Sequence, residues 1–311
     1  MKKVFIDGSA GTTGLRIKDR LSLRSDITLL TLPEELRKDT EARRELLNRA
    51  DIAFLCLPDD AAREAVSLIE NQGTAVIDTS TAHRTADGWT YGFPELVGNE
   101  QVAASRRIAN PGCHASGVVA LVAPLVRAGL IEPTVALTAF SLTGYSGGGK
   151  KMIAAYEGAD RDPLLAAPRQ YALGQTHKHL PEIKVMCGTE RAPVLCPIVG
   201  DFYAGMEVTV PLFADQVRGG IKEIGEVYRE VYGTGLVRFV HDADEAGFLS
   251  AAAFAGRDDM QLTVTGNEER MLLVARFDNL GKGASGAAIQ NMNILLGLDQ
   301  ATGLNIGEES V

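Results

Sequence analysis

The chain has 311 residues, of which 45% are hydrophobic and 23% charged, and its formal net charge is -9. This length exceeds the usual size of a single hydrophobic core, so we expect two domains. The negative charge argues against a nucleic-acid or anionic-membrane partner. No apolar run reaches the ~18 residues of a membrane span, and the N-terminus leads straight into a strand. We therefore expect a cytoplasmic protein without a leader or membrane segment.

The four cysteines indicate reduced thiols rather than a metal or disulfide framework. Their spacing fits no zinc pattern, and a chain of this size does not need disulfides to fold. They are Cys56, Cys113, Cys187 and Cys196.

The first predicted element is a strand over 3–7, followed by a glycine-rich turn and a helix over about 15–23. This order is typical of a dinucleotide site, in which Gly8 permits the turn, Gly11 admits a pyrophosphate and Gly14 lets the helix approach the strand. A tight turn without a ligand is the alternative, because the spacing departs from G-x-G-x-x-G. The predicted cofactor contacts in this turn are Gly8, Ser9, Ala10, Gly11, Thr12, Thr13 and Gly14.

The second strand, predicted over 27–32, indicates the type of dinucleotide. A site that prefers NAD often ends this strand in Asp or Glu, which holds the ribose 2′-hydroxyl. Here the strand ends in Thr31-Leu32, and Arg37 and Lys38 follow, although Glu34 and Glu35 lie close by. We therefore predict NADP(H), with Arg37 and Lys38 near its 2′-phosphate.

Further strands over 50–58 and 75–78, a helix over about 59–71 and the segment 107–110 predict a parallel sheet with crossover helices. Ligands bind at the carboxyl ends of such strands. Pro58 and Ser80 are therefore predicted cofactor contacts. Arg84 and Arg107 lie near strand ends and are predicted to bind the anionic groups of a substrate.

The stretch 109–117 places Cys113 where a turn runs into a buried helix. Pro111 and Gly112 suit a sharp turn, and an apolar run follows over 115–123. The unpaired N–H groups and the dipole of a helix N-terminus favour thiolate over thiol. Cys113 is thus a candidate nucleophile, with a buried structural cysteine as the alternative. The same N–H groups, together with Asn110, would stabilise an oxyanion.

From about residue 135 the pattern changes to longer, alternating strands, predicted over 135–142, 206–212, 261–265 and 271–277. This pattern favours an α+β domain, and an amphipathic helix over 284–298 is expected to pack back on the first domain. We predict a dinucleotide-binding domain over 1–114, joined by 284–311, and an α+β catalytic and oligomerisation domain over 115–283.

His177 and His179 are the best candidates for an acid/base partner of Cys113. On an extended segment, side chains two residues apart point the same way. Pro181 favours an extended conformation in the residue that precedes it. Solvated loop histidines are the alternative. His83 and His114 are weaker candidates, since His114 is expected to point elsewhere on the first turn of the helix, and His241 in its acidic run is interpreted as a solvated surface histidine.

The run 143–151 offers backbone N–H groups, hydroxyls and ammonium groups that suit a phosphate or carboxylate. Ser146, Gly147 and Lys150 are the predicted substrate contacts. A mobile domain connector is the alternative, and the Walker spacing of a P-loop is absent.

Taken together, the motifs resemble the N-acetyl-γ-glutamyl-phosphate reductase family, in its shorter form. The resemblance covers most of the chain. The motifs are 8–14, Asp78-Thr79-Ser80-Thr81-Ala82-His83-Arg84, Tyr91-Gly92-Phe93-Pro94-Glu95-Leu96, Asn110-Pro111-Gly112-Cys113, Ser146-Gly147-Gly148-Gly149-Lys150, His177-Lys178-His179-Leu180-Pro181-Glu182 and 279–286.

The resemblance implies a Rossmann-type α/β domain that binds NADP and an α+β domain that carries catalysis and oligomer contacts, as a dimer or tetramer. It implies Cys113 as the nucleophile and His179, alone or with His177, as the acid/base. Asn279, Gly281 and Gly283 would lie near the nicotinamide, and Glu182 near the substrate. The longer members carry a Pro-x-x-Arg-Gly stretch, whereas the comparable segment here, 196–202, lacks that arginine.

The activity so implied is NADPH-dependent reduction of N-acetyl-γ-glutamyl phosphate to its semialdehyde through a thioester on Cys113, with release of phosphate, in arginine biosynthesis. Two alternatives remain at this point. One is an acyl-phosphate reductase like aspartate-semialdehyde dehydrogenase, and the other is an NADP-sensing regulator without turnover.

Overall fold

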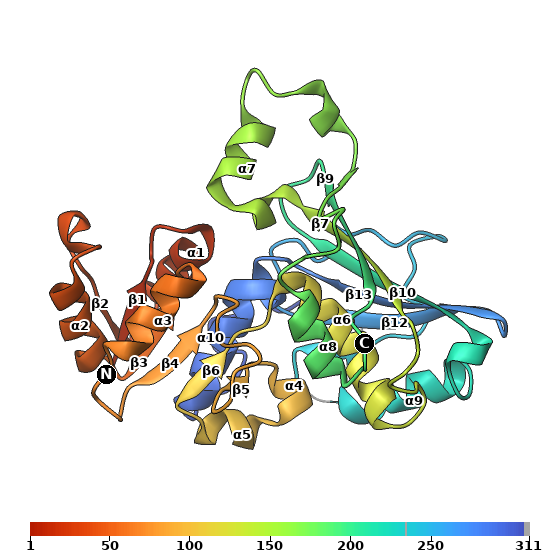
Figure 1. Ribbon diagram of the computed structural model, residues 1–311, viewed down its shortest axis with the longest axis horizontal. Helices are drawn as coiled ribbons and strands as arrows, with labels where there is room; N and C mark the ends of the chain where they lie inside the picture. The colour runs from red at the N-terminus through yellow and green to blue at the C-terminus, as the bar shows by residue number, and fades with distance from the viewer. Residues whose placement is uncertain (234, 308–311) are drawn as a thin grey trace. The chain divides into compact units, whose positions relative to one another are not determined.

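In the computed structural model, which describes residues 1–233 and 235–307, the chain divides into two compact units (Figure 1). The first comprises Met1–Pro111 and Ala284–Leu304, and the second comprises Gly112–Gly283 and the residues from Asn305 onward. Within the described residues, no helix is long and apolar enough to cross a membrane.

The first unit is built on a six-stranded sheet, in the order β2-β1-β3-β4-β6-β5, in which every neighbouring pair is parallel. The central strands read as continuous apolar runs because both faces of the sheet are covered. The strands are β1 (Lys2–Asp7), β2 (Ile27–Leu30), β3 (Ile52–Leu55), β4 (Ala75–Asp78), β5 (Thr90–Tyr91) and β6 (Arg107–Ala109).

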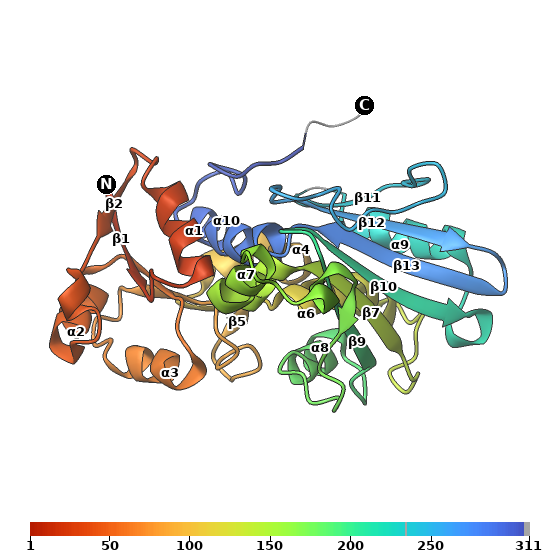
Figure 2. The ribbon, with the colours of Figure 1, turned by 90° about the horizontal axis from the view of Figure 1, so that it is seen from above.

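Helices cover both faces of this sheet (Figure 2). Ile17 of α1 and Ile289 of α10 belong to the core on one face, and Leu47 of α2 and Ala62 of α3 belong to the core on the other. The helices are α1 (Thr12–Leu21), α2 (Thr40–Arg49), α3 (Asp59–Ser67), α4 (Pro94–Val97), α5 (Asn99–Ala104) and α10 (Gly286–Leu295), with a 3-10 turn over Glu34–Leu36.

The second unit is built on a seven-stranded mixed sheet, in the order β11-β12-β13-β10-β7-β9-β8. Only the pairs β7–β9 and β11–β12 are parallel. The strands are β7 (Thr138–Gly144), β8 (Arg169–Gln170), β9 (Val194–Gly200), β10 (Met206–Phe213), β11 (Val237–Phe239), β12 (Met260–Gly266) and β13 (Arg270–Phe277). A parallel sheet unit and an α+β unit are the fold class that the sequence predicts, and that prediction is confirmed.

Helix α6 (Cys113–Arg127) packs directly on one face of this sheet. A Cβ at Gly117 would lie 2.5 Å from Val208 of β10, so only glycine permits this approach. Two tyrosines of the α9 region, Tyr228 and Tyr232, donate hydroxyl hydrogen bonds of 2.6 and 2.8 Å to α6 carbonyls. Each such bond contributes about 1 kcal/mol of net stability. The start of α6 is thereby fixed on a rigid support.

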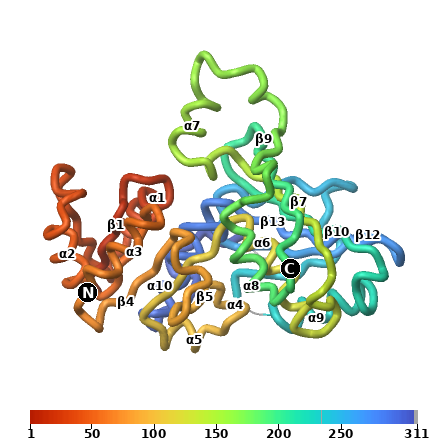
Figure 3. Tube along the Cα trace, in the orientation of Figure 1, coloured from red at the N-terminus to blue at the C-terminus, as the bar shows by residue number. Residues whose placement is uncertain are grey.

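The remaining helices of the second unit are α7 (Gly149–Glu157), α8 (Leu180–Cys187) and α9 (Ile221–Val231). Between β7 and β9 the chain makes one long excursion through α7, which Figure 3 traces as a single loop-out and return. It contains 3-10 turns over Tyr145–Gly148 and Pro163–Ala166. Two further turns, Ala214–Gln216 and the π-helical Gly281–Ser285, lie later in the chain.

The face of the second sheet opposite α6 carries partly exposed apolar side chains. Phe140 is 45% exposed, Val194 52% and Leu272 41%. The strand register places Phe140 beside Thr209 and Cys196, and Leu272 beside Pro211. This set of five strand positions, 140, 194, 196, 211 and 272, is referred to below as the outer sheet face.

Candidate active site

The glycine turn after β1 has the conformation that the sequence predicts. Gly8 has φ +86°, and a Cβ there would lie 2.3 Å from the Cys56 carbonyl oxygen. A Cβ at Gly14 would lie 2.6 Å from the Gly8 carbonyl oxygen, so this glycine lets α1 approach the turn closely. A Cβ at Gly11 would come no closer than 3.8 Å to its nearest contact, the Gly8 carbonyl oxygen, which leaves space for a ligand. The first and third glycines are required by the backbone, and the second lies beside open space.

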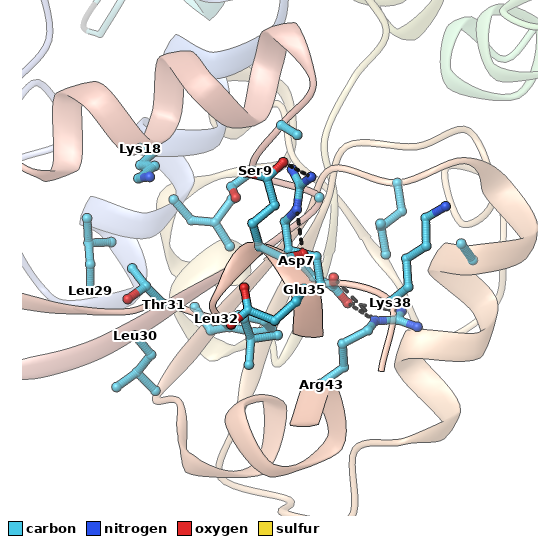
Figure 4. Close-up of a pocket in the computed structure, with 18 residues that line it drawn as sticks. Asp7, Ser9, Lys18, Leu29, Leu30, Thr31, Leu32, Glu35, Lys38 and Arg43 are labelled. Atoms are coloured by element: carbon cyan, nitrogen blue, oxygen red, sulfur yellow. Dashed lines mark hydrogen bonds and ion pairs between the residues drawn. The ribbon is translucent and has the colours of Figure 1, made fainter. Parts of the chain in front are cut away.

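A cavity of about 510 Å³ opens beside this turn (Figure 4). Helix α1 begins at its rim without a side-chain cap, so its first N–H groups are available to an anion. The buried Thr12 Oγ1 has no hydrogen-bond partner among the described residues. An uncapped helix start and an orphaned hydroxyl beside a cavity of this size fit the pyrophosphate of a dinucleotide.

The far wall of the cavity holds the residues that decide between NAD and NADP. Thr31, not an acid, stands at the end of β2, and Lys38 lines the cavity. Arg37 also lines it and forms a 2.6 Å ion pair with Glu34. These basic groups favour a 2′-phosphate, as the sequence predicts.

Asp7 and Arg43 form a buried ion pair at the base of the same cavity, with Nη2 and Oδ2 3.0 Å apart. Burial raises the pKa of Asp7, and the charge of Arg43 acts in the opposite direction. Arg43 also donates to Glu64 of α3 at 2.9 Å. Arg43 therefore ties α2 to β1 and α3, and no motif in the sequence pointed to this role.

Several predicted ligand contacts at the strand ends of the first unit are held in a buried network. Asp78 accepts hydrogen bonds from the backbone N–H and hydroxyl of Ser80, at 2.9 and 2.7 Å, and its Oδ2 lies 2.6 Å from His83 Nδ1. The His83 ring stacks on Trp89 at 4.0 Å. Pro58 lies at the same edge, after β3, as the N-cap residue of α3. Ser80 and Pro58 thus lie at the carboxyl ends of β4 and β3, where a cofactor binds in this class of sheet.

Arg84 and Asn110 are engaged with the backbone in this unit. Arg84 donates to the carbonyls of Asn110 and Thr79, both at 3.0 Å. The Asn110 amide donates to the Ala284 carbonyl at 3.0 Å. Both side chains hold the segment that leads out of β6, which is a structural role.

The prediction that Arg107 binds substrate is wrong in its placement. Arg107 is the first residue of β6, and its guanidinium donates at 3.0 Å to the carbonyl of Thr74, which precedes β4. It therefore lies at the amino edge of the parallel sheet, opposite to the edge where ligands bind.

Cys113 is the first residue of α6, as predicted, and it is partly exposed. The preceding Gly112 donates its N–H at 2.9 Å to Oε1 of Glu182 in α8. Glu182 is buried, with 2% exposure, so it fixes the turn before Cys113. This carboxylate therefore makes a positioning contact with the turn.

The loop that follows β13 packs against Cys113. Asp278 accepts hydrogen bonds from Leu280 and Gly281 N–H, and its carbonyl accepts from Gly283 at 3.0 Å. A Cβ at Gly283 would lie 3.1 Å from the Cβ of Cys113, so a larger residue would crowd the thiol. At Gly281 a Cβ would meet the Arg257 carbonyl.

Two histidine rings and one phenol ring gather around His114, the residue that follows Cys113. His177 and His179 lie 4.6 Å apart between ring centroids, and His114 lies 5.2 and 5.6 Å from them. Tyr171 completes the cluster at 6.0 Å from both His114 and His177. From the first turn of α6, the His114 side chain is directed toward Ser141 of β7 and the histidine segment. Tyr171 lies six positions before His177, and no motif that we considered included it.

The two predicted histidines meet through a turn rather than through an extended segment. Leu180 N–H donates to the His177 carbonyl at 3.0 Å, and His179 N–H donates to His177 Nδ1 at 3.2 Å. Pro181 lies in the first turn of α8, where a missing N–H costs nothing. The extended conformation expected before Pro181 is therefore absent, although the rings still meet.

The glycine–lysine run is ordered rather than a mobile connector. Ser146 is buried and accepts a 3.0 Å hydrogen bond from Asn279, whose Oδ1 accepts from Gly205 N–H at 2.9 Å. Gly147 faces the same Asn279 amide, and Lys150 is exposed in the first turn of α7. The nitrogen and the oxygen of the Asn279 side-chain amide are thus both hydrogen-bonded within the protein.

Comparison with known proteins assigns both units to one class. Residues 3–104 match the family "Semialdehyde dehydrogenase, NAD binding domain", and residues 113–279 match "Semialdehyde dehydrogenase, dimerisation domain". Aspartate semialdehyde dehydrogenase II of Vibrio cholerae has the same fold, with a TM-score of 0.70 at 17% identity over 95% of this chain and 98% of its own. The enzyme with NADP from Candida albicans gives 0.67 at 16% identity, over 94% and 98% of the two chains. The fold is that of a semialdehyde-dehydrogenase-type oxidoreductase.

Closer relatives are found among the N-acetyl-γ-glutamyl-phosphate reductases. The protein of Brucella ovis is 45% identical over 95% of this chain and 99% of its own length. That of Chelativorans sp. is 46% identical over 94% and 98%. The chain belongs to the N-acetyl-γ-glutamyl-phosphate reductase family.

Proposed function

We propose that the protein reduces N-acetyl-γ-glutamyl phosphate to N-acetylglutamate 5-semialdehyde with NADPH and releases phosphate, as a step in arginine biosynthesis. The observation that carries this proposal is the placement of Cys113 at the start of α6, next to His114, whose ring packs against His177 and His179. Membership of the reductase family supports the choice of substrate.

In the proposed reaction the Cys113 thiolate attacks the γ-acyl carbon, which forms a C–S bond and breaks the C–O bond to phosphate. Bound NADPH supplies the hydride that reduces the resulting thioester. His179 protonates the oxygen of the tetrahedral adduct and takes the proton back as the C–S bond breaks. The first N–H groups of α6 stabilise the developing oxyanion, because they are aimed at the space beside Cys113 and have no intrahelical acceptors.

The cofactor contacts that we propose lie in the glycine turn and on the far wall of the cavity in the first unit. Thr12, Gly11 and the start of α1 fit the pyrophosphate, and Lys38 with Arg37 fits the 2′-phosphate. Gly283, which lies against Cys113, remains a candidate contact for the nicotinamide ring of the cofactor.

The substrate contacts that we retain are Ser146, Gly147 and Lys150. The first two lie beside the Asn279 amide, and Lys150 carries an exposed ammonium group close along the chain. Arg84, Arg107 and Glu182 are withdrawn from the substrate site because their side chains are bound to the backbone.

We also propose that two copies of the chain pair through the outer sheet face. The matching family model describes a dimerisation domain over 113–279, and this face carries partly exposed Phe140, Val194 and Leu272. Apolar side chains in such a row are stabilised by burial against a like surface.

Phe140→Arg is expected to convert the dimer to monomers, because it places a charge among apolar side chains of the outer sheet face. Sedimentation velocity measures the change in mass. Leu23→Arg is the control, since Leu23 is 88% exposed on the first unit. A Phe140→Arg variant that remains dimeric would show that the chains pair elsewhere.

The proposed function is tested in the reverse direction with N-acetylglutamate semialdehyde, phosphate and NADP. We expect NADPH formation that requires phosphate and that is weak with aspartate semialdehyde. A preference for aspartate semialdehyde would assign the protein to that enzyme class instead. Binding of NADP without turnover of either aldehyde would indicate a nucleotide-sensing regulator.

A further inference from the structure

Three segments that are distant in the sequence are joined to one another by hydrogen bonds in the second unit. One is the loop 280–283 that packs against Cys113, which is called the cysteine loop below. The others are segment 256–258, just before β12, and segment 305–307. The chain leaves the second unit at the end of the cysteine loop and returns to it at the start of segment 305–307. The proposed reaction described above uses neither of the last two segments.

Asp278 joins the cysteine loop to segment 256–258. It is buried, with 0% exposure. Its Oδ1 accepts the N–H groups of Leu280 and Gly281 at 2.6 and 2.9 Å, and its Oδ2 accepts the N–H of Gly256. Hydrogen bonds from backbone N–H groups to a carboxylate are strong, because the acceptor is charged. One side chain therefore fixes the cysteine loop relative to this segment.

Close packing continues this connection to Cys113. A Cβ at Gly281 would collide with the carbonyl oxygen of Arg257, so the cysteine loop and segment 256–258 are in direct backbone contact. A Cβ at Gly283 would lie 3.1 Å from the Cβ of Cys113, so the other end of the loop is in contact with the cysteine. Groups packed this closely transmit a displacement instead of absorbing it. A shift of segment 256–258 therefore changes the space around the thiol.

Asn305 holds the same segment by three hydrogen bonds. Its carbonyl accepts from Asp258 N–H at 2.7 Å, and its own N–H donates to Asp258 Oδ2 at 2.8 Å. Its side-chain amide donates to the Gly256 carbonyl at 2.9 Å. Gly307, two residues further on, lies against the Arg257 guanidinium, where a Cβ would collide. One residue thus fixes both ends of the segment that supports the cysteine loop.

Asn305 itself is exposed, whereas Asp258 and Asp278 are 0% exposed. Its amide side chain buries little apolar surface, so hydrophobic burial does not account for its contacts. The contacts do restrict segment 256–258, and through it the cysteine loop, because the three segments form one contiguous network. A role in stability alone is the alternative, and it predicts no effect on Cys113.

We propose that Asn305 is a positioning residue for Cys113. By holding segment 256–258, it keeps the cysteine loop packed against Cys113 and fixes the space in which the thiol and its acyl group lie. Asn305 takes no part in the bond changes of the reaction. The effect on turnover rests on the proposed function, because it requires an acyl group on Cys113. The effect on the cysteine loop is independent of that function.

Amide hydrogen exchange tests the connection without substrate. In Asn305→Ala, exchange of the N–H groups in the cysteine loop is expected to accelerate about fivefold, the effect of one lost hydrogen bond on a local opening. Asn267→Ala is the matched control, since Asn267 is also exposed and also bonds backbone groups, the N–H groups of Glu269 and Arg270 at the other end of β13. It should accelerate exchange only in the turn between β12 and β13. Unchanged exchange of the cysteine loop in Asn305→Ala would overturn the proposal.

Alkylation of Cys113 by iodoacetamide tests the space around the thiol, again without substrate. Peptide mass mapping follows Cys113 separately from the other cysteines. The plateau of the rate at high pH reports access to the sulfur, because the fraction of thiolate no longer changes there. We expect this plateau to rise about fivefold in Asn305→Ala and to stay at the wild-type value in Asn267→Ala. Equal plateaus in the two variants would mean that Asn305 contributes to stability alone.

Kinetics of the reverse reaction test the consequence for turnover. Asn305→Ala is expected to lower kcat about 10-fold, since reacting groups that are held less precisely reach the reactive geometry less often. KM for N-acetylglutamate semialdehyde should change by less than about twofold, because the substrate contacts proposed above are retained. Asn267→Ala should lower Tm by a similar amount and keep kcat. An Asn305→Ala variant with a lower Tm and an unchanged kcat would refute the positioning role.

Failure of the proposed function would be recognised separately. If wild-type protein does not turn over N-acetylglutamate semialdehyde, the substrate assignment fails before any variant is compared. Hydrogen exchange and alkylation are still measured in that case, and they then decide whether Asn305 acts on Cys113. If the wild-type protein is active and Asn305→Ala behaves like Asn267→Ala in all three measurements, the proposed function stands and the positioning role of Asn305 is refuted.

Discussion

Replacing Cys113 with serine should abolish reduction while leaving NADPH affinity nearly unchanged. A hydroxyl at this position is not ionised at neutral pH, and the helix N-terminus that favours a thiolate does too little for an alcohol. We expect kcat to fall by about 10³-fold or more, in line with the loss of a covalent nucleophile in other enzymes. Fluorescence titration with NADPH should give a Kd within about twofold of wild type, since a substitution without a cofactor contact has little effect on binding.

The thioester itself provides a sharper readout of the same substitution. Without phosphate, wild-type protein mixed with N-acetylglutamate semialdehyde and NADP should form one NADPH per active site and then stop. Intact-mass measurement should find an N-acetylglutamyl group on the protein. Cys113→Ser should show neither the burst nor the added mass.

Cys196→Ser is the matched control for the cysteine substitution. Cys196 is partly exposed in β9, and its strand register pairs it with Phe140. The neighbouring pair, Ser141 and Pro197, faces α6, so Cys196 points to the opposite face of the sheet. This variant should keep the full burst. Retention of more than a few per cent of activity by Cys113→Ser would refute the nucleophile assignment, because no other thiol is expected to replace it.

Local features of the sequence were sufficient to predict the structure where one short segment determines the backbone conformation. The positive φ of Gly8 and the close approach at Gly14 follow from one strand, one turn and one helix. The start of α6 at Cys113 likewise follows from a turn pair and an apolar run. In each case the residues that interact are near one another in the chain.

The site contacts that sequence reasoning missed join segments that are distant in the chain. His114 meets Tyr171 only because β7 and the excursion after it bring residue 171 back over α6, across 57 positions. Glu182 bonds Gly112 across 70 positions. No periodicity or spacing encodes such pairs, so neither contact could be derived from one sequence.

The prediction for Arg107 failed for a different reason, because the sequence contained the information needed to avoid the error. A parallel strand that leads toward Asn110 must begin at Arg107, which puts this side chain at the amino edge. Nearness to a strand end is therefore not sufficient evidence for a ligand contact. The direction of the strand has to be considered as well.

His179→Gln should lower kcat by about 10² to 10⁴-fold, the usual contribution of a general acid/base. His179 has 4% exposure and lies at the start of α8, beside the His114 ring. His177 is less suited to proton transfer through Nδ1, because that nitrogen accepts the backbone N–H of His179. We therefore expect His177→Gln to lower kcat by less than about 10-fold.

The burst experiment separates the role of His179 from that of Cys113. In His179→Gln the nucleophile is intact, so the burst should reach one NADPH per active site but rise more slowly, by the same factor as kcat. One limb of the pH–rate profile should also disappear, because the group that titrates on that limb is gone. Cys113→Ser, by contrast, should lose the amplitude itself.

His241→Gln is the control for these substitutions, since the His241 side chain is 59% exposed and pairs with Asp242 on the surface. It should leave kcat, burst rate and pH profile unchanged. A larger loss in His177→Gln than in His179→Gln would exchange the two roles. If both variants kept kcat within about threefold, neither histidine would be the acid/base, since proton transfer by a positioned side chain contributes far more than that. The adduct would then depend on the α6 N–H groups for its stabilisation.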